Sequence, residues 1–483
     1  MTVRIGRALP PPSGRAPVLK LAPRDVAGLG NELKQFHQMF ATGFVRREQR
    51  HWALKYSQGQ MLNLERKSIE PMAVAVAGGN IQAMQQFISQ GAWSDDEVLA
   101  IHRRAVAETL GRADGVVILD GCDFPKQGGD SVGVARQYCG PLGKLANCQA
   151  SVVLAYASEL GATLLDRRLY LPREWFDVDH RDRWQKCGIP DAVTFQTKPA
   201  LGAAMLEAVI AEGVVPFRWV TMDEGYGLAG YLLNLIHGKN KLFFAEIPRD
   251  KQAWLHRPKV MPPVVRAPTG RPPTLAHLAP NAPAAQRVDH LAARLRRADW
   301  QRFIIHEGSK GPLEVEIAVR RVVMAEEEMP GRDEWLVVRR PVGELDPKRW
   351  KFYRSNAPAD TPLTTLARMT AWRWPVESVI EECKSELGLD HYEVRGWIGW
   401  HHHTTMTLLA HLFLVRLRVN RGIDAPALTV AQVRKLLQVV LPKREFDVQT
   451  ALEELARIQQ QNHAAYRSHK KRHWRERKSP PPN

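Results

Sequence analysis

The chain has 483 residues, of which 68 are Lys or Arg and 51 are Asp or Glu, so its formal net charge is +17. This length exceeds one typical domain, and the positive charge calls for a polyanionic partner, with nucleic acid first and a membrane surface second. A run of 18 apolar residues and a signal-peptide pattern are both missing, so we expect no membrane association and a cytoplasmic, nucleoid-associated protein.

The N-terminal part of the chain combines an arm without periodicity and a helical region. Residues 1–25 are rich in proline and arginine, which predicts a flexible basic arm without a fold of its own. Between residues 26 and 110, apolar side chains such as Leu33, Phe36 and Phe40 recur every three or four residues, which indicates amphipathic helices. We therefore expect a helical DNA-binding domain at residues 26–110.

A tight glycine turn joins two short helices inside this region. The helices are predicted at Met72–Ala77 and Ile81–Gln90, with Gly78, Gly79 and Asn80 between them. The pattern fits a helix-turn-helix, and it fits an ordinary helical hairpin equally well. Several basic and amide side chains favour DNA binding: Arg66, Lys67, Gln82, Gln85 and Gln86.

Strand patterns begin near residue 115 and predict an α/β core. Three leading strands followed by alternating helices are the order of an RNase H-like fold, which closes with a further helix. We therefore predict the first part of an RNase H-like catalytic core at residues 111–250. Its elements follow the order β-β-β-α-β-α-β: Val116–Asp120, Ala150–Tyr156, Ala162–Leu171, Pro199–Glu212, Phe217–Thr221, Tyr226–His237 and Leu242–Ile247.

A β-rich insertion is predicted to interrupt this core at residues 251–360. It begins with a proline-rich linker over residues 258–283, and His290–Arg297 can form a helix. Four strands are then expected: Gln301–His306, Leu313–Met324, Trp335–Arg340 and Lys351–Ser355.

The stretch Trp374–Gly388 is the one on which the functional interpretation depends. Pro375 suits a first helical turn and Gly388 suits a stop, so the stretch predicts a helix. Glu377 and Lys384 are seven residues apart and lie about 20° apart around the axis, on one face. A surface helix with a charge pair explains this pattern equally well when the helix is considered alone.

The rest of the chain is predicted to be helical. Residues 361–422 supply the closing helices of the core, and residues 423–483 form a helical C-terminal region with a basic tail. The tail, Arg467–Lys478, is typical of a solvated disordered end that adds nonspecific attraction to phosphates. The histidines 401–403 lie at the start of the apolar helix predicted at 403–417. Adjacent positions on a helix point about 100° apart, so these side chains cannot chelate one metal together. We expect them to pack against other helices or to line a wall of the DNA channel.

Two aspartates follow strands of the predicted parallel core. Asp120 and Asp223 are expected to end their strands at one edge of the sheet, where Glu377 can complete the group. Three carboxylates without His or Cys suit Mg²⁺, for which Mn²⁺ can substitute. Two such ions about 4 Å apart would activate a water or a 3′-hydroxyl and stabilise the leaving oxygen of a phosphodiester displacement. Asp123 and Glu381 are the alternative ligands if the assignment is shifted.

Segments around these acids resemble the DDE transposases of bacterial insertion sequences, whose RNase H-like core is split by a β-rich insertion. The stretch 117–128 resembles the family's first-aspartate segment, and 219–227 resembles the second. The stretches 131–140 and 147–149 resemble the family's segments downstream of the first aspartate. The resemblance covers roughly residues 30–440.

The resemblance includes the helix that carries Glu377. Arg373, Glu377 and Lys384 match the family's signature of Arg, three residues, Glu, six residues and Lys. Thr370 stands where the family has a tyrosine, which removes one expected DNA-backbone contact and leaves the metal site alone. The resemblance implies three catalytic, metal-binding residues: Asp120, Asp223 and Glu377. The predicted DNA contacts are Arg373, Lys384, Lys126, Arg136, Arg66, Lys67 and Arg395.

The resemblance implies a DNA transposase that cleaves at transposon ends and transfers the 3′-hydroxyl strand to target DNA by two-metal Mg²⁺ chemistry. Its partners would be double-stranded DNA, as terminal inverted repeats and target, and further copies of the chain in a homodimer or higher oligomer. An RNase H-like nuclease without end specificity and a non-catalytic DNA-binding descendant stay open as alternatives. The insertion of related transposases helps hold a hairpinned or flipped end, and stacking of a base contributes ~1–3 kcal/mol. Four rings are candidates for such stacking: Trp254, Trp300, Trp335 and Trp350.

A nucleotide-cofactor site is the strongest competing interpretation. The stretch 225–230 has the spacing G-x-G-x-x-G after a strand and before a helix, with Glu246 at the end of the next strand. Asp223 and Glu224 would repel a pyrophosphate there, which disfavours it. A P-loop is excluded because Tyr138 stands where its first glycine belongs. The five cysteines, with no C-x-x-C pair, are expected to be reduced and structural.

Overall fold

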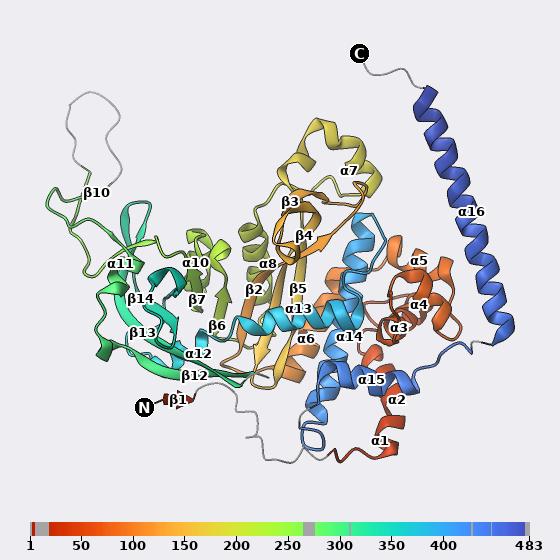
Figure 1. The fold of residues 1–483 in the computed structure, drawn as a ribbon, viewed down its shortest axis with the longest axis horizontal. Coiled ribbons are helices and arrows are strands. Elements are labelled where there is room, and N and C mark those ends of the chain that lie inside the picture. The colour runs from red at the N-terminus through yellow and green to blue at the C-terminus, as the bar shows by residue number, and fades with distance from the viewer. Residues whose placement is uncertain are drawn as a thin grey trace.

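The structure, a computed structural model, describes residues 2–4, 19–263, 276–308, 311–426, 428–445 and 447–478. One large mixed sheet forms its centre, helices cover the sheet, and the last helix, α16 (Val448–Lys478), projects away from the body (Figure 1). The predicted α/β class is thereby confirmed. Within the described ranges, no helix is long and apolar enough to cross a membrane.

The N-terminal region consists of helices, as its periodicity predicts. They are α1 (Pro23–Ala27), α2 (Leu29–Gln38), α3 (Arg47–Met61), α4 (Ile69–Ala75), α5 (Ile81–Ser89) and α6 (Asp95–Leu110). Apolar side chains from these helices and their loops, including Phe36 and Phe40, are buried in the same cluster as the strands of the core. Asn80 caps α5 by accepting a hydrogen bond from the backbone N–H of Ala83. The two predicted short helices are therefore present on either side of the glycine turn.

The core sheet combines antiparallel and parallel pairs around its central strand. Its elements are β2 (Val116–Pro125), β3 (Ala135–Cys139), β4 (Lys144–Ser158), β5 (Gly161–Tyr170), α7 (Arg181–Cys187), α8 (Lys198–Glu212), β6 (Trp219–Met222), α9 (Glu224–Gly227), α10 (Gly230–Gly238) and β7 (Leu242–Ile247). β4 pairs antiparallel with both β2 and β5, whereas β6 lies parallel between β2 and β7. The predicted order of strands and helices is present, with β3 and α7 added.

The predicted insertion continues the core sheet. Its elements are β8 (Gln252–Trp254), β9 (Val260–Met261), β10 (His277–Leu278), β11 (Gln286–Arg287), α11 (Val288–Ala293), β12 (Gln301–Gly308), β13 (Gly311–Glu326), β14 (Met329–Pro341) and β15 (Lys351–Ser355). β15 pairs antiparallel with β7, with Phe352 opposite Ile247. The four predicted strands are thus present as β12 to β15, and they extend the sheet outward from β7. Residues 264–275 of the predicted linker lie outside the described ranges.

Two expectations about the ends of the chain are wrong where the structure describes them. Thr2–Arg4 of the predicted arm form a strand, β1, which pairs in parallel with β12 and covers its edge. Residues 5–18 of the arm lie outside the described ranges. At the other end, the basic tail expected to be disordered continues α16 as a helix to Lys478.

The C-terminal helices close the core. They are α12 (Leu363–Met369), α13 (Trp374–Leu387), α14 (Trp397–Asn420) and α15 (Val430–Val440). α14 is buried along most of its length and packs against α3, α5, α6 and β5. His402 stacks on Trp93 with ring centroids 3.6 Å apart, and His403 Nδ1 lies 2.7 Å from the Tyr56 hydroxyl. The histidine run therefore serves helix packing, as one of the two interpretations predicted, and forms no channel wall.

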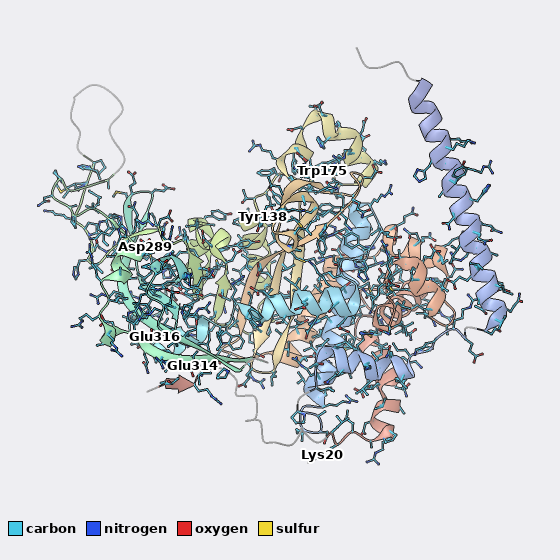
Figure 2. The ribbon with its side chains drawn as sticks, in the orientation of Figure 1. Lys20, Tyr138, Trp175, Asp289, Glu314 and Glu316 are labelled. Carbon is cyan, nitrogen blue, oxygen red and sulfur yellow. The ribbon has the colours of Figure 1, made fainter. Side chains whose placement is uncertain are left out.

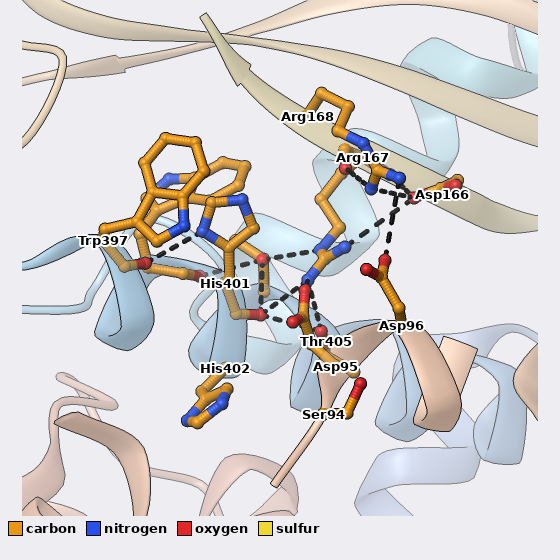
Figure 3. Close-up of polar contacts among 12 residues, drawn as sticks. Ser94, Asp95, Asp96, Asp166, Arg167, Arg168, Trp397, His401, His402 and Thr405 are labelled. Atoms are coloured by element: carbon orange, nitrogen blue, oxygen red, sulfur yellow. Dashed lines mark hydrogen bonds and ion pairs between the residues drawn. The ribbon is translucent and has the colours of Figure 1, made fainter. Parts of the chain in front are cut away.

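A buried arginine joins the N-terminal helices to the sheet and to α14 (Figure 3). Arg167 extends from β5, and its Nη2 donates to Asp95 Oδ2 on α6 at 2.5 Å and to Thr405 Oγ1 on α14 at 2.6 Å. Its Nε donates to Thr404 Oγ1 at 3.0 Å. The arginine is 1% exposed. The predicted boundary at residue 110 therefore lies between two parts that share both an apolar core and a buried polar network.

Candidate active site

The parallel pairing of β2 and β6 places two aspartates side by side. The register ends with Leu119 opposite Met222, and Asp120 and Asp223 are the next residues of their strands. Asp223 follows the end of β6, as predicted. Asp120 does not end β2, because the strand continues to Pro125 by pairing with β4. The pairing of β2 with β6 ends just before Asp120. The two aspartates therefore lie close together because of the register between β2 and β6, although β2 itself is longer.

Backbone hydrogen bonds orient both aspartates. Asp120 Oδ1 accepts from the N–H of Gly121 at 2.8 Å. Asp223 Oδ1 caps α9 by accepting from the N–H of Tyr226 at 3.3 Å. Among the described residues, no donor bonds the second oxygen of Asp223. Each aspartate thus keeps its Oδ2 for a partner outside the backbone.

α13 brings a basic and an acidic side chain to these aspartates. Pro375 lies in its first turn and Gly388 ends it with a φ of 71°, as predicted. Arg373, just before the helix, donates from Nη1 to Asp120 Oδ2 at 3.1 Å and from Nη2 to Glu377 Oε1 at 2.6 Å. The guanidinium therefore bridges the first and third predicted acids.

The electrostatics of the cluster show that its acids interact. Burial raises the pKa of Asp120 to about 6, with Asp223 and Glu377 raising it further and Arg373 opposing them. Burial also disfavours the charged form of Arg373, but the neighbouring carboxylates raise its pKa overall. The sequence interpretation assigned Arg373 to DNA phosphates and missed these ion pairs. The four-residue spacing between Arg373 and Glu377 was the available signal.

The donor chemistry of the cluster fits a hard divalent cation. Asp120, Asp223 and Glu377 offer only carboxylate oxygens, which is the ligand type that Mg²⁺ takes. Within the described ranges, no group of three or more His, Cys, Asp or Glu residues is arranged to hold a metal ion. The positive charge of Arg373 lies between two of the acids, Asp120 and Glu377. The residues fit the metal in type, and Arg373 stands in for the cation between Asp120 and Glu377.

Comparison with known proteins identifies the family. The sequence pattern of the DDE superfamily endonucleases matches residues 39–312, which is more than half of the chain. The chain belongs to the DDE superfamily of endonucleases. The matched residues include Asp120 and Asp223 and end before Glu377.

One relative and one solved structure show how far the likeness reaches. The probable transposase for insertion sequence element IS701 from Microchaete diplosiphon is 26% identical over 180 residues, which are 37% of this chain and 43% of the relative. The match therefore spans less than half of that relative's length. The piggyBac transposase, in a synaptic complex with hairpin DNA, is 9% identical with a TM-score of 0.40, over 87% of this chain and 79% of its own.

Lys384 of this DDE endonuclease binds the strand of the first aspartate. Its Nζ donates to the carbonyl oxygen of Asp123 on β2 at 2.9 Å. One oxygen of the Asp123 carboxylate, Oδ2, accepts from the N–H of Gly140 at 2.9 Å, whereas its Oδ1 is buried without a hydrogen-bond partner among the described residues. Glu381, the other alternative ligand, is exposed on α13. Among the described residues, Arg373 bonds Asp120 and Glu377, and it bonds neither Asp223 nor the alternative acids Asp123 and Glu381.

Four other predicted DNA contacts lie at or near the surface. Arg136 is exposed on β3. Lys126 places its Nζ 3.6 Å from the ring centroid of Tyr392, and burial lowers its pKa to about 8. Arg66 and Arg395 form exposed ion pairs with Glu393 at 2.9 Å and Asp130 at 3.1 Å respectively. Exposed pairs of this kind cost little to break, so these arginines can exchange their partners for phosphates.

The prediction that Lys67 contacts DNA is wrong. Its residue is 2% exposed, and its Nζ donates to the carbonyl oxygens of Gln60 and Glu386. Burial lowers its pKa to about 7. Because Glu386 is in the last turn of α13, Lys67 caps the C-terminal end of the helix that carries Glu377. The sequence shows a lysine between polar residues and gives no sign of this burial.

A cavity of ≈360 Å³ opens beside Glu377, between α13 and the strands of the insertion. Its lining includes Tyr353 and an ion pair between Glu246 and Lys351. Trp374, in the first turn of α13, lines the same cavity and is 58% exposed. The exposed aromatic ring next to the acids is therefore outside the set of four tryptophans considered from the sequence.

Those four tryptophans have partners within the protein. Trp254 and Trp350 are buried. Trp300 stacks on the guanidinium of Arg340, whose Cζ is 3.8 Å from the ring centroid. Trp335 Nε1 donates to the carbonyl oxygen of Pro358 at 3.0 Å. Each of the four rings is thus buried or has a partner within the protein.

The second glycine of the competing cofactor motif, Gly227, serves packing. A Cβ at Gly227 would lie 2.1 Å from the carbonyl oxygen of Glu246, so α9 packs directly against the backbone of β7. A dinucleotide motif needs its glycines at an open approach to the pyrophosphate. Gly227 has no such opening, which disfavours the cofactor interpretation.

Proposed function

We propose that this DDE endonuclease is a DNA transposase that cleaves at transposon ends and transfers the 3′-hydroxyl strand to target DNA. The observation that carries the proposal is the convergence of Asp120, Asp223 and Glu377 around Arg373, from β2, β6 and α13. The net charge of +17 supports a polyanionic substrate. The strand order β5-β4-β2-β6-β7 supports an RNase H-like core, with the insertion after β7 and α13 closing it.

The three acids would hold Mg²⁺ or Mn²⁺, which when bound activates the attacking water or 3′-hydroxyl and stabilises the leaving oxygen. Arg373 neutralises Asp120 and Glu377 in the DNA-free protein. With a cation held by these acids, the planar guanidinium of Arg373 would be free to bind a phosphate of the substrate. Lys384 fixes α13 to β2 through the Asp123 carbonyl and so keeps Glu377 beside Asp120.

The N-terminal helices are proposed to recognise the terminal repeats. Gln82, Gln85 and Gln86 are exposed on α5, and amide side chains of this kind can read adenine edges in the major groove. A groove of ≈390 Å³ separates this face from the start of α3. The basic side chains at that start are exposed: Arg46, Arg47 and Arg50. They are placed to bind phosphates on either side of bases that the glutamines read, and a homodimer or higher oligomer would pair two ends.

Conservative replacement of the acids tests the proposal. Asp120→Asn, Asp223→Asn and Glu377→Gln should each lower cleavage of the element's terminal DNA in Mg²⁺ by about 100-fold or more, because the transition-state charge loses its stabilisation. DNA affinity should change little. Glu381→Gln is the matched control, since it removes an exposed acid one turn away on the same helix.

Cleavage at near wild-type rates in any two of the three acid variants would overturn the assignment. The products separate the transposase from a nuclease of the same fold. A transposase joins the 3′-hydroxyl of a pre-cleaved end to a second duplex, whereas a nuclease releases only shortened strands.

A further inference from the structure

A β-hairpin next to the acids carries an exposed face with an aromatic and an aliphatic side chain. β3 pairs with the start of β4 so that Tyr138 lies opposite Leu145 and Arg136 lies opposite Asn147. Alternation along the strands places these four side chains on one face, which we call the hairpin face. Tyr138 is 61% exposed and Leu145 is 63% exposed. Because Tyr138 and Leu145 lie opposite each other in the register, they form one contiguous exposed apolar patch and not two isolated side chains.

The opposite side of the hairpin is packed against the protein. Ala135, Cys139 and Cys148 are buried. Trp175, which Figure 2 labels near Tyr138, donates from Nε1 to the carbonyl oxygen of Val134 at 3.0 Å, just before β3. The hairpin is therefore held from its inner side while its outer face is open to solvent.

The turn of the hairpin is attached to the strand that carries the first acid. The N–H of Gly140 donates to Asp123 Oδ2 at 2.9 Å, and Lys384 donates to the carbonyl oxygen of the same residue. Asp123 lies three residues after Asp120 on β2, which is about 10 Å at 3.3 Å per residue. This corresponds to roughly three steps of a DNA duplex at 3.4 Å each. A strand with its scissile phosphate at Asp120 would thus reach the hairpin within a few nucleotides.

The charge of the hairpin favours a phosphate-containing occupant. Residues 135–147 contain two basic side chains, Arg136 and Lys144, and no acidic one. Both are exposed, and neither forms a hydrogen bond or ion pair with the part of the chain that the structure describes. A second copy of a chain with a charge of +17 would bring like charge to this face. DNA supplies phosphates for the basic groups and base faces for the ring.

We propose that the hairpin face binds unpaired nucleotides beside the cleaved phosphate. Tyr138 stacks on a base, Leu145 packs against the same base or its neighbour, and Arg136 binds a flanking phosphate, whereas Lys144 lies opposite Cys139 and so belongs to the other side of the hairpin. The proposal rests on the proposed function, because it places the cleaved phosphate at Asp120. It concerns the flank of the cleavage point and not the recognition of the terminal repeat.

A forked duplex with one 2-aminopurine in its unpaired arm tests the hairpin in the full-length chain, with a chelator present so that the strands stay intact. Wild-type protein should quench the fluorescence and bind the fork more tightly than a blunt duplex. Tyr138→Ala should lose the quenching and weaken fork binding by roughly 5- to 150-fold, as the loss of one stacked base predicts. Tyr138→Phe should retain both, because it keeps the ring.

Matched variants show whether the effect belongs to the hairpin. Tyr466→Ala removes a tyrosine with the same exposed fraction, 61%, from α16 and should behave as wild type in both measurements. Arg136→Gln should flatten the log–log salt dependence of fork binding by about one unit, as expected for one phosphate contact. Blunt-duplex affinity should change less than fork affinity in Tyr138→Ala.

Three results would overturn the inference in ways that can be told apart. If wild type quenches the probe and Tyr138→Ala does so equally, the hairpin does not hold the unpaired arm, and the proposed function is untouched. If wild type binds neither DNA, the proposed function fails and the inference fails with it. Loss of self-association in Tyr138→Ala with unchanged quenching would identify the face as an interface between copies, which also overturns the inference.

Discussion

Replacing Arg167 by methionine should lower the free energy of unfolding by about 3 kcal/mol. Methionine replaces the aliphatic stem but loses the hydrogen bonds to Asp95, Thr404, Thr405 and the carbonyl oxygen of His401 (Figure 3). Removing one partner of a buried ion pair costs roughly 3–5 kcal/mol when the other charge stays buried. The side chain of Asp95 is 24% exposed, so water can hydrate it in part. We therefore expect the lower end of that range.

Urea unfolding, followed by circular dichroism, measures this loss. Arg168→Met is the matched control, because Arg168 is the next residue of β5 and its side chain is 31% exposed. Its ion pair with Asp96, at 3.7 Å, faces solvent. Its other partner, Asp166 at 3.1 Å, is buried but keeps Arg103 at 3.6 Å and Arg167 at 3.7 Å, so the control should lose less than Arg167→Met. A double-mutant cycle of Arg167→Met with Asp95→Asn should give a coupling energy of at least about 1 kcal/mol.

The pattern of losses decides whether the network holds the N-terminal helices to the sheet. Equal losses for Arg167→Met and Arg168→Met would refute the reasoning, because burial would then make no difference. A coupling energy near zero would also refute it, since the two side chains would act independently. If the reasoning holds, hydrogen exchange in α6 and α14 should accelerate more than exchange in β14.

Two further expectations concern packing and pH. Gly227→Ala should destabilise the protein by about 1–3 kcal/mol, because the new Cβ would lie 2.1 Å from the Glu246 carbonyl oxygen. Gly238→Ala is the control, because a Cβ there meets nothing within 4 Å. Thermal unfolding of the two variants compares their stabilities. Burial lowers the pKa of three histidines to about 4. These side chains are neutral in the folded protein and protonate near pH 6.5 in the unfolded chain. Their contribution to the free energy of unfolding should therefore be fully present above pH 6.5 and should fall as the pH drops toward 4. Urea titrations at pH 5 should show a loss of up to about 2 kcal/mol per histidine. Stability that rose on acidification over this range would contradict the expectation. The histidines are His102, His402 and His403.

The order of elements could be predicted because it depends on local patterns. Alternation and apolar runs gave the strands of the core and insertion, and the turn chemistry of Pro375 and Gly388 gave the bounds of α13. The acids could be chosen because Asp223 follows a short buried strand directly. These signals lie within a few residues of one another in the chain, so no knowledge of distant contacts is needed.

Pairing between distant segments could not be predicted in the same way. β15 pairs with β7 across about a hundred residues, which makes the insertion part of the core sheet. Lys67 is buried because α13, more than 300 residues later, ends against it. The sequence alone does not show whether a strand edge or a basic side chain is covered by another segment or exposed to water. Such features depend on the assembled fold.

The double role proposed for Arg373 shows why the site itself exceeds the sequence pattern. Burial, together with the neighbouring charges of Asp223 and Glu377, raises the pKa of Asp120, so the three carboxylates brought together by β2, β6 and α13 need positive charge whether or not a metal is bound. Arg373 supplies that charge through Asp120 and Glu377. A sequence motif records only that an arginine accompanies the acids. The structure adds that the same arginine satisfies them, so cation binding at the acids and phosphate binding by Arg373 are coupled steps in the proposed reaction.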